Sequence, residues 1–158
     1  MATIQLVVFE IDESEYGIDA LAVNGILRSK KFKVQKLPGI SNVIEGMINL
    51  RGHVNYIYNL RTKFGLKKAE LADESKFVMI NVGSQVVGCI VDEVTDIVKF
   101  DEADLQPAPS LSTNQKGMSY LKGIGKVEDR MIIILDPVEL LSTEETVEID
   151  LAFKALNN

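Results

Sequence analysis

The chain has 158 residues, of which 46% are hydrophobic and 25% are charged, and its formal net charge is −6. This length suits one domain or two small subdomains with a shared core, and the hydrophobic share is sufficient for a packed interior. Because phosphate binding draws on clustered Lys and Arg, the acidic balance argues against a nucleic-acid partner. The nearest basic cluster, Arg28–Lys36, is short and is interpreted as a solvated loop.

Cysteine usage and hydropathy indicate a cytoplasmic protein. Cys89 is the only cysteine, so no internal disulfide can form. No apolar stretch approaches the roughly 20 residues that span a bilayer. The N-terminus also lacks the basic start and cleavage site of a signal peptide. We therefore expect a cytoplasmic chain with no direct membrane insertion.

Short β-type runs separated by Gly, Asp, Asn and Pro dominate the chain from its N-terminus. This pattern is typical of a barrel or sandwich rather than a parallel βαβ fold. The first expected strands are Leu6–Ile11, Tyr16–Ile18, Val23–Leu27 and Lys33–Leu37. Helical signals are few, with single turns expected at Ser41–Glu45, Leu60–Phe64 and Pro137–Leu141. A capping box at Ser142–Glu145 predicts a C-terminal helix over about residues 142–156.

The segment Glu45–Leu66 is the most informative part of the sequence. It is predicted as a hydrophobic strand, a tight turn, a second strand and a short helix closed by Gly65. Arg51 stands at the turn between the two apolar runs, where a cation gains nothing from the core. Arg51 is therefore interpreted either as a recognition element or as a structural residue that pins the turn through an internal salt bridge.

Two parts of the chain resemble each other. Tyr16–Ile26 aligns without gaps on Val87–Ile97, and each copy is preceded by an apolar strand and followed by a Gly-led strand pair. Such self-similarity predicts a duplicated β module. The second copy lacks the Asn-Leu-Arg-Gly turn of the first, so the first turn is the specialised one. The expected bounds are about residues 1–66 for the first module, about 67–76 for a polar connection and about 77–141 for the second module.

The residue inventory argues against an enzyme. His53 is the only histidine, so a His-rich zinc site is excluded, and one His with one Cys does not make a structural metal site. A nucleophile pair of His53 and Cys89 is disfavoured, because Cys89 falls at a strand position where a buried small hydrophobe is expected. Gly123–Gly125 lacks a dinucleotide fingerprint, and Asp101–Asp104 lacks the ligand spacing of a calcium loop. We therefore expect no cofactor and no metal.

At the Asn49–Gly52 turn the sequence resembles the CheW family of bacterial chemotaxis coupling proteins. The resemblance covers about residues 4–141. It implies a mainly β fold of two SH3-like five-stranded β-barrel subdomains related by a pseudo-twofold axis, with few short helices. The matching motifs are Phe9–Asp19, Leu37-Pro38, Gly46–Gly52, Asn59–Leu66, Val86–Val98, Gln106–Pro109, Tyr120–Gly125 and Asp129–Asp136.

The resemblance also implies a non-enzymatic adaptor. Such proteins join the cytoplasmic tips of methyl-accepting chemoreceptors to the regulatory domain of the histidine kinase CheA, and the receptor tip lies in an apolar groove between the subdomains. The resemblance assigns no kinase-contact residue. The positions that match the receptor groove are Val23, Gly46, Arg51 and Gly88, with Ile97 nearby, and the turn and capping positions are Asn49, Gly52 and Asn59.

Three positions depart from the family pattern. Gly25 stands where an acidic residue is common, and Tyr56 and Asn59 stand where proline and aspartate are common. These departures leave open a divergent scaffold of a non-flagellar pathway, such as one that serves pili. Two other functional classes fit the sequence less well. An oligonucleotide-binding barrel is disfavoured by the acidic charge and the few aromatic side chains on which bases could stack, and the other class is a small hydrolase that uses His53.

Overall fold

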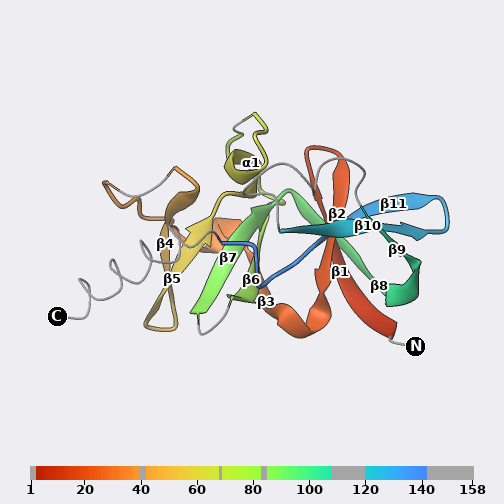
Figure 1. Cartoon of the computed structure of the whole chain (residues 1–158). Coiled ribbons are helices and arrows are strands. Elements are labelled where there is room, and N and C mark those ends of the chain that lie inside the picture. Colours follow the sequence, from red (N-terminus) through yellow and green to blue (C-terminus); the bar gives the residue numbers. More distant parts are fainter. Residues whose placement is uncertain (1–2, 40–41, 68, 83–84, 108–119, 142–158) are drawn as a thin grey trace.

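The computed structural model describes residues 3–39, 42–67, 69–82, 85–107 and 120–141, most of them in β-strands (Figure 1). The first part forms β1 (Thr3–Ile11), β2 (Ser14–Asp19), β3 (Val23–Arg28), β4 (Ile44–Leu50) and β5 (His53–Tyr58). The second part forms β6 (Lys76–Val82), β7 (Gln85–Val91), β8 (Glu93–Asp101), β9 (Leu105–Gln106), β10 (Leu121–Val127) and β11 (Arg130–Leu135). The described helices are α1 (Leu60–Lys63) and the single 3-10 turns η1 (Ala20–Ala22), η2 (Ser29–Lys31) and η3 (Glu102–Asp104).

The strands form two sheets that lie side by side in Figure 1. The six-stranded sheet has the order β8-β1-β2-β11-β10-β9, and the five-stranded sheet has the order β3-β6-β7-β5-β4. Neighbouring strands are antiparallel except for β11 with β2 and β5 with β7, which are parallel. Each sheet therefore contains strands from both halves of the chain.

Each sheet curls around a hydrophobic core of its own. In the six-stranded sheet, Val98 of β8 and Leu105 of β9 pack against one cluster with Leu6, although β8 and β9 are opposite edges of the sheet. In the five-stranded sheet, Leu27 of β3 and Ile48 of β4 likewise share one cluster across opposite edges. We call the six-stranded structure barrel A and the five-stranded structure barrel B. The expected mainly β fold of two barrels with few helices is confirmed, although barrel A has six strands instead of the expected five, because the two-residue strand β9 is added at its edge.

A third and larger cluster fills the space between the barrels. In β1, Leu6 and Val8 point into barrel A, whereas Val7 and Phe9 point into this inter-barrel core. β6 alternates in the same way between barrel B and the inter-barrel core. Because successive side chains of a strand point to opposite faces, both strands are buried on both faces. Their uninterrupted apolar runs in the sequence follow from this double burial.

The internal repeat of the sequence reappears in the strand pairing. The strands β1–β5 of the first module correspond in order to β6, β7, β8, β10 and β11 of the second. Replacing each strand of barrel B by its counterpart gives the strand order of barrel A, except for β9, which has no counterpart. Val23 pairs with Ile80 as Val94 pairs with Phe9, and a bulge interrupts the register directly beside each pair. The gapless alignment of the two segments therefore agrees with the observed register.

The two modules exchange strands. β1 and β2 of the first module lie in barrel A with strands of the second module, and β6 and β7 of the second module complete barrel B. Only Asp92 separates the end of β7 in barrel B from the start of β8 in barrel A. This short link leaves no room for β8 to turn back onto β7. The boundary between modules in the sequence is therefore distinct from the boundary between barrels.

The predictions of two elements near β4 are wrong. Lys33–Leu37 does not form a full strand, because only Gln35 pairs, with Met47, before the chain turns away at Gly39. The described part of Ser41–Glu45 is not helical. Ile44 begins β4 instead, since its side chain is buried in the inter-barrel core.

The remaining helical expectations have different outcomes. The turn at Leu60–Phe64 is confirmed as α1, and Gly65 follows it with φ +73°. Pro137–Leu141 is wrong as a helix, because it forms a turn that directs Leu140 into the inter-barrel core. The expected C-terminal helix at about 142–156 lies outside the described residues. None of the helices in the described part of the chain has the length and apolar character needed to cross a membrane.

Candidate functional site

Arg51 lies at the tip of the β4–β5 hairpin, in a two-residue loop. The backbone φ is +53° at Arg51 and +85° at Gly52, the left-handed pair that a type I′ turn requires. The side-chain Oδ1 of Asn49 accepts a hydrogen bond from the backbone N–H of Gly52 at 2.8 Å. Glycine adopts such a conformation freely, whereas arginine is strained in it. The turn expected from the sequence is confirmed, with a strained and exposed cation at its tip.

The side chain of Arg51 has no ion-pair partner among the described residues. The structural interpretation of Arg51 required an internal salt bridge to pin the turn. The turn is instead held by the Asn49 side chain and by the conformational freedom of Gly52. The guanidinium of Arg51 is therefore available to another molecule.

Arg51 borders a pocket of about 430 Å³ at one end of barrel B, which we call the barrel B mouth. Leu27, Met79 and Val86 line it and also belong to or pack against the core of barrel B. His53 is the other residue in the lining that can carry a positive charge. No carboxylate lines the pocket among the residues that the structure describes. The mouth thus joins an apolar wall to an uncompensated basic border.

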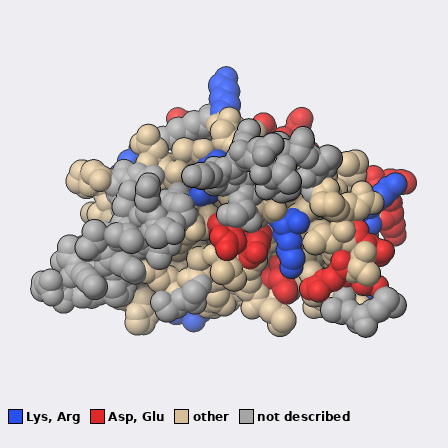
Figure 2. Space-filling model, viewed as in Figure 1, with Lys and Arg blue, Asp and Glu red and all other residues tan. Residues whose placement is uncertain are grey.

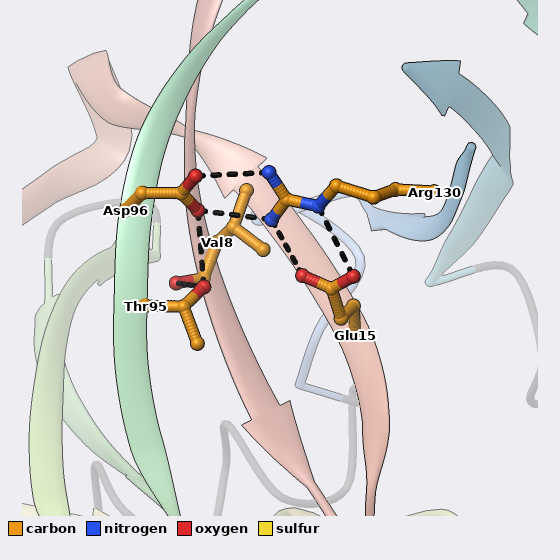
Figure 3. Close-up of polar contacts among 5 residues, drawn as sticks. All are labelled: Val8, Glu15, Thr95, Asp96 and Arg130. Atoms are coloured by element: carbon orange, nitrogen blue, oxygen red, sulfur yellow. Dashed lines mark hydrogen bonds and ion pairs between the residues drawn. The ribbon is translucent and has the colours of Figure 1, made fainter. Parts of the chain in front are cut away.

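The corresponding end of barrel A carries an ion cluster (Figure 3). Arg130 of β11 donates to the two carboxylate oxygens of Glu15 of β2 at 3.2 and 2.5 Å, and to both oxygens of Asp96 of β8 at 2.9 Å. The hydroxyl of Thr95 donates to the backbone carbonyl of Val8 at 3.2 Å. Hydrogen bonding from Arg130 holds the pKa of the Asp96 carboxyl below its usual range. The cluster therefore braces three strands across β1.

Val23 and Ile97 lie on the edge strands β3 and β8, which correspond in the repeat. Val23 and its repeat partner Val94 both pack against the inter-barrel core. Three residues further on in each copy, Ile26 and Ile97 expose 42% and 60% of their surface. The edge strands of both barrels therefore present apolar side chains beside the inter-barrel core. The structure does not bring Ile97 into the barrel B mouth.

Gly46 and Gly88, predicted as groove positions, are buried in the sheets. A Cβ at Gly46 would lie 2.4 Å from the backbone oxygen of Gln35. A Cβ at Gly88 would lie 2.8 Å from Ile57 and 2.9 Å from the Met79 sulfur. Glycine is needed at Gly46, where the neighbour is backbone, whereas at Gly88 the neighbours are the ends of the Ile57 and Met79 side chains, which can shift. A direct contact of either glycine with a partner stays a prediction.

Two of the three positions that are expected to depart from the family pattern are internal. Asn59 is 5% exposed and caps α1, accepting a hydrogen bond from the backbone N–H of Thr62 at 3.3 Å. Tyr56 is 3% exposed, and burial raises the pKa of its hydroxyl. That hydroxyl has no hydrogen-bond partner in the described structure. Gly25 differs from both, because it lines the barrel B mouth.

The possible nucleophile pair is separated in the structure. Cys89 is fully buried, and burial raises the pKa of its thiol, which disfavours the reactive thiolate. Cys89 pairs with Tyr58 at the far end of β5 from His53, about 16 Å away at 3.3 Å per residue. Among the described residues no group of His, Cys, Asp and Glu has the arrangement of a metal site.

Sequence reasoning missed two arginines that organise the molecule. Arg130 forms the barrel A cluster, and Arg61 of α1 donates to Asp92 at 2.7 Å. Asp92 also accepts from the backbone N–H of Asp12, so this contact ties the β1–β2 turn to the link between the barrels. When the repeat alignment is extended as far as β11, Arg130 aligns with His53. The sequence therefore contained a signal that the second module carries an arginine at this position.

Comparison with known proteins gives consistent matches over nearly the whole chain. A family model described as the CheW-like domain matches residues 5–145. The chemotaxis protein CheW of Klebsiella aerogenes is 32% identical over 146 residues, covering 92% of this chain and 86% of that protein. The chemotaxis protein CheW of Bacillus subtilis is 32% identical over 142 residues, covering 90% of this chain and 89% of that protein. The crystal structure of the scaffolding protein TtCheW from Thermoanaerobacter tengcongensis matches with a TM-score of 0.79 at 30% identity, covering 92% of each chain.

Proposed function

The chain belongs to the family of CheW-like chemotaxis proteins, and on this premise we propose that it is a non-enzymatic adaptor. It couples the cytoplasmic tips of methyl-accepting chemoreceptors to the regulatory domain of the histidine kinase CheA. Its place in the cell is the cytoplasmic side of receptor arrays, which it reaches through these partners.

The observation that carries the proposal is the strained, exposed and unpaired cation at Arg51. A left-handed backbone costs free energy at a non-glycine residue, and in the described structure the Arg51 side chain returns none of it through an ion pair. Arginine is enriched among the residues that dominate protein interfaces. A role in recognition accounts for an arginine at this position better than a role in stability.

The apolar edge strands supply the surface for a receptor helix. An amphipathic helix binds a groove through apolar anchors at helical spacing. Val23, Ile26 and Ile97 offer apolar contacts beside the inter-barrel core. Gly46 and Gly88 are buried in barrel B, so they would support binding through strand packing rather than through contact. Arg51 provides a planar donor set for a carboxylate or carbonyl of the receptor.

Replacement of Arg51 by alanine tests this assignment. We expect affinity for a receptor-tip fragment to fall by about tenfold or more, as for other interface arginines. The melting temperature should stay nearly unchanged, because Asn49 and Gly52 hold the turn. Calorimetric titration measures the first quantity and thermal unfolding the second. Asn49→Ala is the matched control, which lowers the melting temperature. A steep fall in melting temperature for Arg51→Ala would make Arg51 structural.

The adaptor role itself is tested by reconstitution. The protein, the CheA regulatory domain and a receptor-tip fragment should elute together as a ternary complex in size-exclusion chromatography. If the protein fails to bind the CheA regulatory domain or fails to bind the receptor-tip fragment, the proposal is contradicted. A scaffold in a non-flagellar chemosensory pathway is the alternative. A deletion strain separates the two, since flagellar swimming is lost in one case and pilus-based or another behaviour in the other.

A further inference from the structure

The short helix α1 (Leu60–Lys63) follows the last strand of barrel B and packs against barrel A. Phe64, the residue after α1, lies between the rings of Tyr16 in β2 and Tyr120 directly before β10. The ring centroids are 5.0 and 5.5 Å apart, and the rings are nearly parallel. Phe9 of β1 continues the stack beyond Tyr16 at 6.0 Å. Phe64 therefore inserts a ring from the chain that leaves barrel B into an aromatic stack of barrel A.

Arg61 of α1 binds the covalent link between the barrels. Its guanidinium donates to Asp92, the residue that joins β7 to β8, at 2.7 Å. It also lies 3.9 Å from the carboxylate of Asp12 in the β1–β2 turn and donates to the backbone carbonyl of Lys67 at 3.2 Å. Acidic side chains gather on the barrel A side of the face seen in Figure 2, so the field of barrel A attracts a cation. Arg61 thus holds α1 to the link and to barrel A at once.

The segment after β11, which corresponds to α1 in the repeat, crosses in the opposite direction. Leu140 is buried in the inter-barrel core, and its carbonyl accepts a hydrogen bond from the Tyr58 hydroxyl of β5 at 3.1 Å. The ammonium of Lys63 lies 6.0 Å from the centroid of the Tyr58 ring and 5.2 Å from that of the Tyr120 ring. The segments that follow the two hairpins therefore brace the barrels from both sides of the interface.

These contacts are directional, whereas the inter-barrel core is not. Hydrophobic burial depends on area and not on direction, and packed layers can slide past each other by small shear movements. Aromatic stacking and charge-assisted hydrogen bonds depend on ring geometry and on donor angle. The contacts of Phe64 and Arg61 therefore select one orientation among those that the apolar core would accept.

We propose that Phe64 and Arg61 are positioning residues, which fix the orientation of barrel B on barrel A and thereby preset the receptor-binding surface. This inference rests on the proposed function, in which one receptor helix contacts Ile26 of β3 in barrel B and Ile97 of β8 in barrel A. A helix that touches both strands needs them at a fixed separation. Figure 1 shows α1 at the top of the molecule and β3 at the bottom, so α1 acts through orientation and not through contact.

Matched substitutions separate orientation from stability. Phe64→Leu removes the stacked ring and keeps an apolar side chain, and Phe64→Tyr keeps the ring. Phe100→Leu is the control, because it makes the same change inside the core of barrel A alone. Arg61→Gln removes the ion pairs of α1, and its control is Arg130→Gln, whose ion pairs lie within barrel A.

The first measurement uses the full chain alone. Residual dipolar couplings of the backbone N–H groups report the orientation of each barrel in a weakly aligned sample. In the unaltered protein, in Phe64→Tyr and in both controls, one alignment tensor should fit the two barrels. In Phe64→Leu and Arg61→Gln, the tensors fitted separately to barrel A and barrel B should differ.

The second measurement is calorimetric titration of the same proteins with a receptor-tip fragment, well below their melting temperatures. We expect Phe64→Leu to weaken binding by about three- to tenfold, as when only about a third to a tenth of the molecules hold the competent orientation. Arg61→Gln should weaken it by about threefold. Phe64→Tyr, Phe100→Leu and Arg130→Gln should bind within about twofold of the unaltered protein.

Three outcomes would overturn the inference. A single common tensor in both Phe64→Leu and Arg61→Gln would show that α1 does not set the orientation. Unchanged receptor affinity in these variants, with altered tensors, would show that the orientation does not preset the surface. Equal weakening by Phe100→Leu would assign the effect to stability. If the unaltered protein binds no receptor-tip fragment, the receptor arm of the proposed function fails, whereas the dipolar couplings still decide whether α1 orients the barrels.

Discussion

At the scale of single residues, the buried amide of Asn59 connects two segments. Its Oδ1 accepts from the backbone N–H of Thr62 at 3.3 Å, and its Nδ2 donates to a carboxylate oxygen of Glu45 at 3.1 Å. An amide can donate and accept, whereas an ionised carboxylate only accepts. The neighbouring Glu45 therefore gives asparagine a partner that an ionised aspartate at this position would not have.

Asn59→Asp should destabilise the protein at neutral pH. The variant keeps the cap on Thr62 but replaces the hydrogen bond to Glu45 with a contact between two carboxylates, at a cost of about 1–3 kcal/mol. Like charges raise the pKa of this carboxyl pair, so the folded state binds a proton more tightly than the unfolded state. The loss should be small near pH 4 and grow as pH rises toward 7. Urea unfolding across this range measures it.

The double variant with Glu45→Gln supplies the control for this prediction. Glutamine removes the second negative charge and can donate to the introduced carboxylate. It should therefore restore most of the lost free energy of unfolding. Equal stability of Asn59→Asp and the unaltered protein at pH 7 would contradict the account.

Residue roles were predictable from the sequence where they depend on the local chain. The turn at Arg51 and the cap at Asn59 are local, and both agree with expectation. The burial of Gly46, Tyr56 and Gly88 depends on which strands lie on either side. In a strand that is covered on both faces, nearly all side chains are apolar, so the sequence does not show which core each side chain enters. These placements therefore required the structure.

At the scale of elements, the Arg130 cluster joins β2, β8 and β11 by side chains alone. Arg130, Glu15 and Asp96 keep 28%, 24% and 42% of their side-chain surface exposed, so solvent screens the pairs in part. Bidentate geometry and the shared guanidinium make this network stronger than an isolated surface pair. We expect Asp96 to contribute about 1 kcal/mol to the free energy of unfolding, the upper end of the range for solvent-screened ion pairs.

Asp96→Asn should reveal this contribution through its pH dependence. Hydrogen bonding from Arg130 lowers the pKa of Asp96 in the folded state. A lowered pKa stabilises the protein above the unfolded value, near 4, and this stability is lost as pH falls through the folded pKa. The unaltered protein should therefore exceed Asp96→Asn in unfolding free energy at pH 7 and approach it near pH 3. Parallel curves from urea unfolding at each pH would contradict this expectation.

The elements themselves were predictable wherever apolar runs are long. Strands such as Val23–Leu27 and the helix at Leu60–Phe64 match β3 and α1 closely. The errors at Lys33–Leu37 and Ser41–Glu45 lie in short stretches where local propensity is weak. There a tertiary contact decides, as when burial of Ile44 extends β4.

At the scale of the whole molecule, strand exchange makes the two barrels one folding unit. The sequence repeat predicts a duplicated module, and the strand orders agree with it. Sequence alone could not show that β1 pairs with β8, since a repeat gives no information on which copy supplies a neighbour. The exchange places β1 and β6 between the cores, so neither barrel is complete without the other module.

This architecture predicts that neither half of the chain folds alone as a monomer. A fragment of residues 1–70 keeps β1 and β2 but loses β8 and β11, their neighbours in barrel A. It also loses β6 and β7, which lie between β3 and β5 in barrel B. Each fragment would expose the apolar residues of the inter-barrel core, and small domains have little stability to spare. Residues 1–70 and 71–158 should therefore each give poorly dispersed NMR spectra.

Mixing the two fragments tests whether they complete each other. An equimolar mixture should recover the dispersed spectrum of the intact chain, since the cut lies outside the described strands. Proteolytic cleavage of the folded protein after Glu70 is the control, and it should leave the two pieces associated. A folded, monomeric fragment 1–70 would show that the first module can close its own barrel, contrary to the exchanged pairing.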